Sequence, residues 1–301
     1  MNRDSHPLCQ PRAALPSEDK FLPIFSRQIG EHVNLNEQNS MAAVRSRLYE
    51  SYATTHAGRS GADAAVYVYR RDIRPHLPGG RPARVLDIGC GQGKLVRLLR
   101  EDGHDASGVD VSPEQVALAH EAGVAAVVLG DFIHVLAARR GDLDAVVATD
   151  LLEHLTKDEV LQVFDSVRGA LRPSGVFIAR TPNAISPFSG GLQYGDFTHE
   201  SVFTPRSVTQ IASATGYVSV QVRPCPPVVH GVQSRARAVI WKAFSGVMKL
   251  AIAAETGQRH DQIVTQNMTF VAQTGGESPV VELSIPCAVT STPQDGSPVN
   301  G

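Results

Sequence analysis

Hydrophobic residues change their spacing repeatedly between residues 84 and 181. Short apolar runs alternate with stretches in which apolar residues recur every three or four positions. The runs are typical of buried strands, and the wider spacing is typical of helices that bury one face. The pattern predicts strands at 84–89, 105–109, 124–129, 143–148 and 175–181, and helices at 93–102, 113–122, 132–139 and 157–171. Because strand and helix alternate, we expect an α/β fold with a parallel sheet covered on both faces.

The sequence after residue 181 predicts one more helix and two more strands. Thr204-Pro205 is a helix cap followed by a first-turn proline. Apolar and polar residues alternate at 217–223 and again at 263–273, as they do in half-buried strands. These elements complete a domain at 81–274 that contains a helical insertion at 224–262.

The two ends of the chain differ from this core. Apolar residues at helical spacing predict two helices within 41–80, which we expect to form an N-terminal lid, the first helix carrying Tyr49 and Tyr52. Residues 1–40 are rich in Pro, Gln, Asn and Ser, and residues 275–301 are rich in Pro, Ser and Thr. Because neither segment shows a sustained period, we expect a poorly ordered N-terminus and a loose tail.

The composition of the whole chain argues against several classes of protein. The 28 basic and 30 acidic residues nearly balance, so the overall charge does not indicate nucleic-acid binding. The polar N-terminus lacks the apolar core of a signal peptide, and no stretch approaches the roughly 18 apolar residues of a membrane span. The cysteines are scattered, form no C-x-x-C pair and predict neither a disulfide framework nor a zinc site; they are Cys9, Cys90, Cys225 and Cys287. We therefore expect a soluble cytoplasmic protein in a reducing compartment.

The stretch from Arg84 to Leu95 carries the strongest indication of a ligand. Its apolar run ends in Gly89, Gly91 and Gly93, after which helical spacing begins. Glycine allows positive φ and a close approach of the backbone to a ligand, and the helix start offers unpaired N–H groups. Together with Asp87, the spacing is D-x-G-x-G-x-G rather than the G-x-G-x-x-G of dinucleotide sites, which argues against a nicotinamide oxidoreductase.

This pattern resembles motif I of the class I S-adenosylmethionine (SAM) dependent methyltransferases. Three further acids extend the resemblance, because Asp110, Asp131 and Asp150 each follow a predicted strand. The carboxyl ends of parallel strands meet at one edge of a sheet, so we expect these acids to converge. The resemblance implies a Rossmann-like, seven-stranded, mostly parallel sheet whose last strand is antiparallel, with SAM as cofactor and S-adenosylhomocysteine as product.

Each part of SAM would need a different protein partner. An acid about 20 residues after the glycine turn suits the ribose hydroxyls, and Asp110 holds that position. The resemblance implies that Asp131 faces the adenine amino group beside Phe132, and that the first two glycines approach the methionine part. Asp87 is expected to order the turn and the cofactor ammonium. The predicted cofactor set is Asp87, Gly89, Cys90, Gly91, Gly93, Asp110, Val111, Asp131, Phe132, Asp150 and Leu151.

Methyl transfer from a sulfonium to a hydroxyl needs in-line positioning and a base. The loop at 181–203, roughly 20 residues long, exceeds ordinary connections and lies on the same edge as the acids. Imidazole titrates near neutral pH, so His199 is the predicted base, with Asp196 or Glu200 orienting it, and His154 is the rival. The histidines show no H-x-H or H-x-x-x-H spacing, so no metal is predicted. The predicted acceptor contacts are Tyr194, Glu200 and Asn183.

The segment 194–203 indicates a subgroup of these methyltransferases. With the preceding Thr181-Pro-Asn, it resembles bacterial methyltransferases associated with surface-polysaccharide and lipopolysaccharide assembly, which methylate sugar hydroxyls. This implies O-methylation of a sugar in a surface glycan or glycolipid. Ubiquinone-type O-methyltransferases share Leu-Leu-Glu-His at 151–154, so an O- or N-methyltransferase of a quinone or another small metabolite is the alternative. A noncatalytic partner subunit with the SAM fold is the alternative of another class, and the intact glycines and Asp110 argue against it.

The balanced total charge hides a basic region at 206–260, in which Glu255 is the only acid. The apolar residues of its predicted helix form one stripe: Ile240, Trp241, Phe244, Val247, Met248 and Ala251. Flanked by Lys242 and Lys249, this stripe is typical of a helix that lies on a membrane surface or against a partner. Three partners are open for residues 238–252: their own domain, a homodimer mate, or the inner membrane face that would present a lipid- or phosphate-linked substrate.

Overall fold

The structure, a computed structural model, describes Leu48 and residues 62–229, 231–257 and 262–276. The chain divides into two compact units, and the unit Ala57–Gly301 contains all of these residues except Leu48. The predicted disordered start, the first lid helix with Tyr49 and Tyr52, and the tail beyond residue 276 lie outside the described residues.

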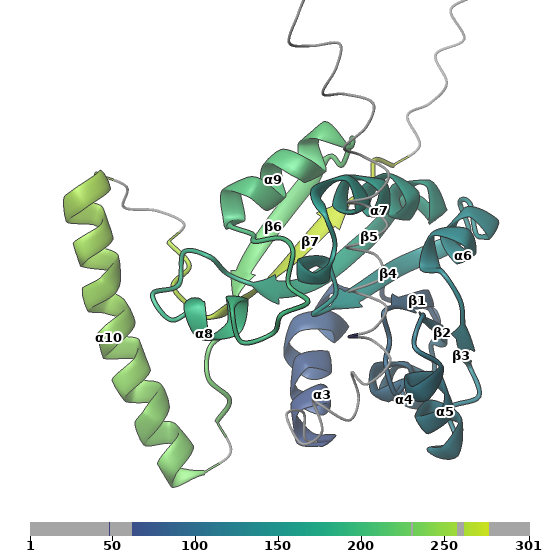
Figure 1. Cartoon of the computed structure of the whole chain (residues 1–301), viewed down its shortest axis with the longest axis horizontal. Coiled ribbons are helices and arrows are strands. Elements are labelled where there is room, and N and C mark those ends of the chain that lie inside the picture. The colour runs from purple at the N-terminus through teal and green to yellow at the C-terminus, as the bar shows by residue number, and fades with distance from the viewer. Residues whose placement is uncertain (1–47, 49–61, 230, 258–261, 277–301) are drawn as a thin grey trace, which may run out of the picture. The chain divides into compact units, whose positions relative to one another are not determined.

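A seven-stranded sheet forms the centre of the described unit (Figure 1). Its strands, in the order β3-β2-β1-β4-β5-β7-β6 across the sheet, are β1 Arg84–Ile88, β2 Asp105–Asp110, β3 Val127–Leu129, β4 Leu143–Thr149, β5 Leu171–Pro182, β6 Ser219–Pro224 and β7 Asn267–Gln273. Strands β1 to β5 pair in parallel, and β7 pairs antiparallel with both β5 and β6. The Rossmann-like sheet with an antiparallel last strand is thus confirmed.

Helices cover both faces of this sheet, as the alternating pattern predicted. Figure 1 shows α4 (Lys94–Glu101) and α5 (Pro113–Glu121) on one face, and α6 (Phe132–Ala138), α7 (Lys157–Ala170) and α9 (Pro205–Ala214) on the other. Neighbouring strand residues alternate between two separate cores. The core under α4 and α5 contains Val85, Ala145 and Val147, whereas the core under α6, α7 and α9 contains Leu86, Val146 and Ala148. Burial on both faces explains why these strands are apolar throughout.

Several boundaries differ from the prediction: β3 begins at Val127 rather than at residue 124, β7 begins at Asn267 rather than at residue 263, and a helix and β5 differ as follows. The second of the two helices expected within 41–80 is divided into α3 (Ala62–Val68), the π-helical η2 (Tyr69–Ile73) and the 3₁₀ turn η3 (Arg74–His76). A continuous α-helix cannot pass Pro75, because proline lacks the N–H group that the helix needs. Strand β5 begins at Leu171 rather than at residue 175, and its pairing with β4 shifts so that residues 172–175 bulge out.

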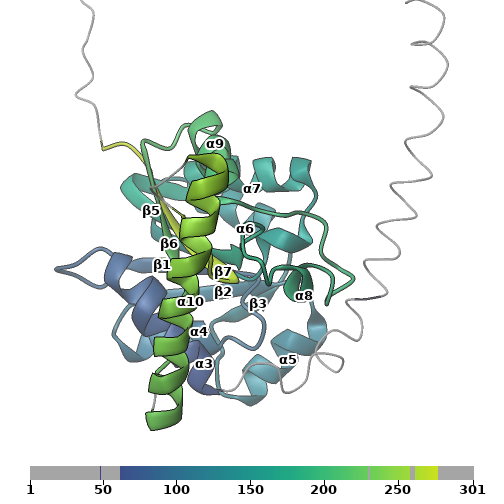
Figure 2. The same cartoon turned by 90° about the vertical axis from the view of Figure 1, so that its left-hand side faces the viewer.

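Four short or inserted elements complete the described unit. They are η4 (Leu152–His154) after β4, α8 (Gly190–Gln193) in the loop after β5, η3 before β1, and the insertion helix α10 (Val232–Thr256) between β6 and β7. Figure 2 shows α10 as one continuous helix facing the viewer. At 25 residues it extends well beyond the predicted stripe at 240–251.

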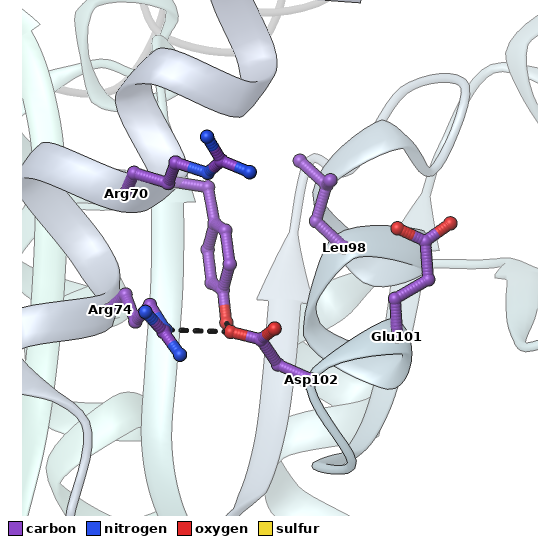
Figure 3. Close-up of a pocket in the computed structure, with 6 residues that line it drawn as sticks. Arg70, Arg74, Leu98, Glu101 and Asp102 are labelled. Atoms are coloured by element: carbon purple, nitrogen blue, oxygen red, sulfur yellow. Dashed lines mark hydrogen bonds and ion pairs between the residues drawn. The ribbon is translucent and has the colours of Figure 1, made fainter.

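A small pocket lies between η2 and the far end of α4 (Figure 3). Tyr69 donates a hydrogen bond from its Oη to Asp102 Oδ2 at 2.6 Å, and Arg74 Nε lies 2.7 Å from the same oxygen. These contacts fasten η2 and η3 to α4. Because the glycine turn is at the opposite, N-terminal end of α4, this pocket is separate from the predicted cofactor site.

Candidate active site

The glycine turn between β1 and α4 has the backbone conformation that the sequence predicted. Gly89, Gly91 and Gly93 have φ values of 67°, 51° and 67°, in the left-handed region that favours glycine. A Cβ atom added at Gly89 would lie 2.9 Å from Leu151 Cδ1, so glycine also lets the turn approach the segment after β4. The residue before α4, Gly93, makes no side-chain capping hydrogen bond.

Asp110 holds this turn through one carboxylate oxygen and the segment after β2 through the other. Oδ2 accepts a hydrogen bond from the Gly91 N–H at 2.8 Å, and Oδ1 accepts one from the Ser112 N–H at 2.9 Å. Burial raises the pKa of Asp110, and the hydrogen bonds from Ser112 and Gly91 oppose that shift. Each carboxylate oxygen can accept a second bond, so Asp110 can still receive hydroxyl donors. Val111, beside it, is 52% exposed and offers an apolar surface.

Asp87 lies at the end of β1 with its side chain 1% exposed. Its Oδ1 is buried and has no hydrogen-bond partner among the described residues. Burial raises the pKa of Asp87 well above its usual value, and the negative charge of Asp110 adds to the shift. A buried carboxyl with an unused oxygen costs free energy unless a donor or a positive charge satisfies it. The cationic amino-acid part of SAM has the chemistry that fits this oxygen.

Gly108 is a cofactor-edge residue that sequence analysis missed. A Cβ atom there would lie 2.6 Å from Cys90 Sγ and 2.8 Å from Val96 Cγ2, so only glycine lets β2 lie against the turn. Cys90, which the sequence placed in the cofactor set, is partly buried and fills the space that Gly108 leaves. Burial raises the pKa of the Cys90 thiol, with the carboxylates of Asp87 and Asp110 adding to the shift. The only sequence signal was its position two residues before Asp110.

The remaining predicted cofactor residues lie at the ends of β3 and β4. Asp131 caps α6 by accepting a hydrogen bond from the Ile133 N–H at 2.8 Å, and it is half exposed. Phe132 is only 9% exposed and packs into the core under α6, which leaves little of its ring for an adenine. Asp150 has a positive φ of 54° and an ion pair of 2.5 Å with Arg180.

A second group of polar side chains lies just beyond the end of β4. Glu153 and His154 are on η4, and His199 comes from the long loop after β5. The rings of His154 and His199 meet edge to face, with centroids 4.7 Å apart. His154 and His199, 45 positions apart in the sequence, thus lie in one cluster. Within it, the buried Nδ1 of His199 has no hydrogen-bond partner among the described residues.

A hydrogen-bonded relay orients His154. The Thr198 hydroxyl lies 2.6 Å from Asp196 Oδ1, to which it donates, and 2.7 Å from His154 Nδ1. A threonine hydroxyl has a single proton, so once it donates to the carboxylate it can only accept from the histidine. Nδ1 of His154 therefore carries the hydrogen, and Nε2 is the basic nitrogen. The sequence predicted that Asp196 orients His199, whereas the structure links its carboxylate to His154 through Thr198.

Glu153 belongs to the same cluster and is its most deeply buried member. Its side chain is 2% exposed, and its Oε2 accepts a hydrogen bond from the Thr181 hydroxyl at 3.2 Å. Burial raises the pKa of Glu153 well above its usual value, and the charge of Asp150 adds to the shift. Its backbone carbonyl also accepts hydrogen bonds from the N–H groups of Glu200 and Ser201, at 2.8 and 3.0 Å, which fixes the loop onto η4.

One atom each of Glu153, His154 and His199 lies within 4.8 Å of the others, so these residues form a potential metal-ligand set. Imidazole nitrogen and carboxylate oxygen are common ligands of zinc and other divalent ions. These three residues come from two distant segments, so no short histidine spacing in the sequence marks the set. A metal-free reaction therefore stays a prediction.

The predicted acceptor contacts have different environments. Tyr194 is 87% exposed, and the Glu200 side chain is exposed beside His199. Asn183 is fully buried: its Nδ2 donates to the carbonyls of Ile263 and Thr265, at 2.7 and 3.0 Å. Asn183 thus links the start of the loop to the segment before β7, and its amide stabilises the fold. Tyr194, by contrast, is exposed and available to a substrate.

Comparison with known proteins identifies the family. A family profile described as a methyltransferase domain matches residues 63–222. A ubiquinone biosynthesis O-methyltransferase of Xanthomonas campestris is 32% identical over 130 residues, which are 40% of this chain and 52% of that one. A corresponding enzyme of Xanthomonas oryzae is 32% identical over 121 residues, covering 37% of this chain and 50% of that one. The chain thus spans about half the length of these curated relatives.

Solved structures agree on the fold. A SAM-dependent methyltransferase from Archaeoglobus fulgidus matches with a TM-score of 0.57 at 22% identity, over 74% of this chain and 99% of that one. A phosphoethanolamine N-methyltransferase of Haemonchus contortus, solved with SAM, matches with a TM-score of 0.50 at 17% identity, over 76% of this chain and 60% of that one. With the family profile covering more than half of its length, this chain belongs to the methyltransferase domain family and has the fold of its SAM-dependent members.

Proposed function

We propose that this protein transfers the methyl group of SAM to a hydroxyl group, with His199 as the general base. The observation that carries this proposal is the buried, unpartnered Nδ1 of His199 beside the oriented ring of His154. A buried polar atom without a partner costs about 1–3 kcal/mol, so the cluster is incomplete until a ligand or water joins it. An acceptor hydroxyl is a ligand that fits, because it brings both a donor and an acceptor.

The proposed site has a cofactor half, which would hold SAM, and an acceptor half, which would bind the hydroxyl and accept its proton. SAM supplies an activated methyl group on a positively charged sulfur. The glycine turn and Asp110 hold the cofactor, with Asp87 facing its ammonium. His199 would accept the hydroxyl proton as the oxygen bonds to the methyl carbon and the bond from that carbon to sulfur breaks, which would leave S-adenosylhomocysteine. The Asp196–Thr198–His154 relay holds the paired ring in one orientation. Base assistance of this kind contributes typically about 100-fold to 10,000-fold to a rate.

Two classes of hydroxyl are supported by different observations. The segment 194–203 resembles methyltransferases that act on sugars of surface glycans or glycolipids, which makes a sugar hydroxyl the first candidate. The curated relatives are named for ubiquinone biosynthesis, which favours the hydroxyl of a quinone precursor or another small metabolite. A third possibility is that the protein is a noncatalytic partner subunit, and an experiment must distinguish it from the two enzymatic functions.

The deciding experiment follows a labelled methyl group from SAM into a lysate of a strain that lacks this gene. The lysate is fractionated into lipid, polysaccharide, small-molecule, protein and nucleic-acid pools. Label in the polysaccharide or glycolipid pool supports a sugar acceptor, and label in the quinone or small-molecule pool supports the alternative. No label from a protein that binds SAM would overturn catalysis altogether.

Metal removal tests whether the cluster at Glu153, His154 and His199 works as a base or as a metal centre. We expect dialysis against a chelator to leave the rate of methyl transfer unchanged, since the mechanism needs only an imidazole and a bound hydroxyl. Loss of activity that added zinc, manganese or magnesium restores would contradict the metal-free mechanism and make these three residues ligands.

A further inference from the structure

Helix α10 contacts its own domain through one side only. Phe188, in the loop after β5, packs against Trp241 and Phe244 with ring centroids 6.2 and 5.6 Å apart. With about 100° between successive residues, the partly buried positions share one side of the helix, except Ala253 near its end. Those on the shared side are Ser234, Ala238, Trp241, Ser245, Met248 and Ile252. The body-facing side of α10 is thus a mixture of serine and apolar residues.

The opposite side of α10 is apolar and exposed, which reverses the usual pattern of a surface helix. Its large residues are Val232, Val239, Ile240, Val247 and Leu250, with exposed fractions of 83%, 69%, 69%, 65% and 71%. Ala236 and Ala243 lie between them and are also exposed. No described side chain covers this outward face. At about 1.5 Å per residue, the 25-residue helix presents it over about 37 Å.

Positive charges border the outward face. Arg235, Lys242 and Lys249 are spaced by seven residues and therefore form one row along its edge, and Arg237 lies on the other side. Glu255 is the only acid of the helix. An apolar face with a cationic border matches the boundary between acyl chains and anionic headgroups, where apolar residues enter and Lys or Arg side chains reach outward.

A second copy of the chain fits this face poorly. Two α10 helices packed face to face would place the basic row either against the other basic row or against apolar residues, because the helix has no acidic row to complement it. Complementary charge comes instead from a surface rich in phosphate. Among the described residues, no helix is both long enough and apolar enough to span a membrane, so α10 would lie along the surface.

We propose that the outward face of α10 docks the protein on an anionic lipid surface. On the body-facing side, the contact of Phe188 with Trp241 and Phe244 joins α10 to the same loop that carries His199, so docking would hold the acceptor side of the site near the lipid. The docking itself does not depend on methyl transfer, and it can be measured on protein whose SAM binding is measured in parallel.

The test is co-sedimentation of the full chain with vesicles of phosphatidylcholine alone and with vesicles that contain about 30% phosphatidylglycerol. We expect pelleting with the anionic vesicles at low salt, at least fivefold less with neutral vesicles, and release as salt rises, because surface charge attraction is screened. The apolar variant Val239→Asp/Leu250→Asp should lose binding. The charge variant Arg235→Glu/Lys242→Glu/Lys249→Glu should lose its preference for phosphatidylglycerol.

A matched control is Val218→Asp, which places the same charge on a 66% exposed valine outside α10. This variant should bind vesicles as the native chain does, and all variants should retain SAM affinity, which shows that they fold. Absence of pelleting with anionic vesicles at low salt would overturn the proposal. So would a lipid-free dimer, seen by sedimentation equilibrium, that Val239→Asp/Leu250→Asp dissociates, because the face would then belong to a second copy.

Discussion

The two halves of the proposed site are built in different ways. At the cofactor edge, Asp110 accepts a hydrogen bond from the backbone N–H of Gly91, in the turn after the neighbouring strand, and another from the backbone N–H of Ser112, just after its own strand. At the acceptor edge, His154 and His199 come from separate segments, and their arrangement depends on side-chain contacts through Thr198. Backbone conformation dominates the first half, and a network of side chains dominates the second.

This difference has consequences for substitution. A turn held by backbone hydrogen bonds is expected to fail as a unit when its anchor is removed, and the failure should be seen in cofactor affinity. A side-chain network can lose one member while the cofactor half stays intact, so the failure should be seen in the rate of transfer. Variants that separate affinity from rate therefore test whether the division is real.

The largest effect is expected for Asp110→Ala. The substitution removes the acceptor of the Gly91 and Ser112 N–H groups together with the candidate ribose contact. Losing several hydrogen bonds to a charged group should cost about 3 kcal/mol or more, equivalent to at least about 100-fold in SAM affinity. Titration calorimetry measures this loss.

Asp105→Ala is the matched control, because Asp105 begins the same strand and its side chain is 68% exposed at the far end. Its SAM affinity should stay within about twofold of the native value, as for most exposed positions. Equal losses in the two variants would mean that β2 as a whole, rather than the anchored turn, determines affinity.

The next effect is expected for His199→Gln. Glutamine keeps polar atoms but cannot act as a base near neutral pH, so kcat should fall by about 100-fold or more while SAM affinity is retained. Lys157→Gln, at an exposed position at the start of α7, supplies the control and should keep the native kcat. A variant His199→Gln with full activity would refute His199 as the base and direct attention to His154.

A smaller effect is expected for Thr198→Val, which tests the relay. Valine is similar in shape but leaves the Nδ1–H of His154 without its acceptor, so the ring is no longer held in one tautomer. We expect kcat to fall by about tenfold, equivalent to about 1.4 kcal/mol, with SAM affinity unchanged. Thr198→Ser should restore the rate, since serine also provides the hydroxyl. Failure of the serine variant to do so would indicate a packing role.

The sequence predicted the cofactor half of the site more completely than the acceptor half, because backbone conformation is easier to predict from residue type than a network of side chains. Left-handed φ at Gly89 favours glycine at that position, so it can be predicted from the residue type alone. The link from Asp196 to His154 depends on Thr198, and no periodic pattern marks a hydroxyl that serves as a bridge. Gly108 was missed because its need for glycine arises from contact with Cys90 across two strands. An apolar stripe was predicted on α10, but of its residues only Ile240 and Val247 belong to the exposed outward face, whereas Trp241 and Met248 lie on the body-facing side.

The smallest expected effect is the change of thermal stability and of SAM affinity with pH that Asp87 causes. Its raised pKa means that the native state binds more protons than the unfolded state above the ordinary Asp pKa of 3.8. Its contribution to stability is therefore full below that value and is lost as pH rises through the raised native pKa. Glu153 contributes in the same direction. The protein without cofactor should consequently lose thermal stability as pH increases.

Bound SAM should reverse the contribution of Asp87, because a nearby ammonium favours the carboxylate and lowers its pKa. SAM affinity is therefore expected to increase about threefold from about pH 5 to about pH 7, a range in which the cofactor amine stays charged. In Asp87→Asn this pH dependence should disappear, whereas the decrease in thermal stability due to Glu153 should remain. If Asp87→Asn retained the native pH dependence of SAM affinity, the unpartnered oxygen of Asp87 would not face the cofactor ammonium. The division between the two edges would then rest on Asp110 alone.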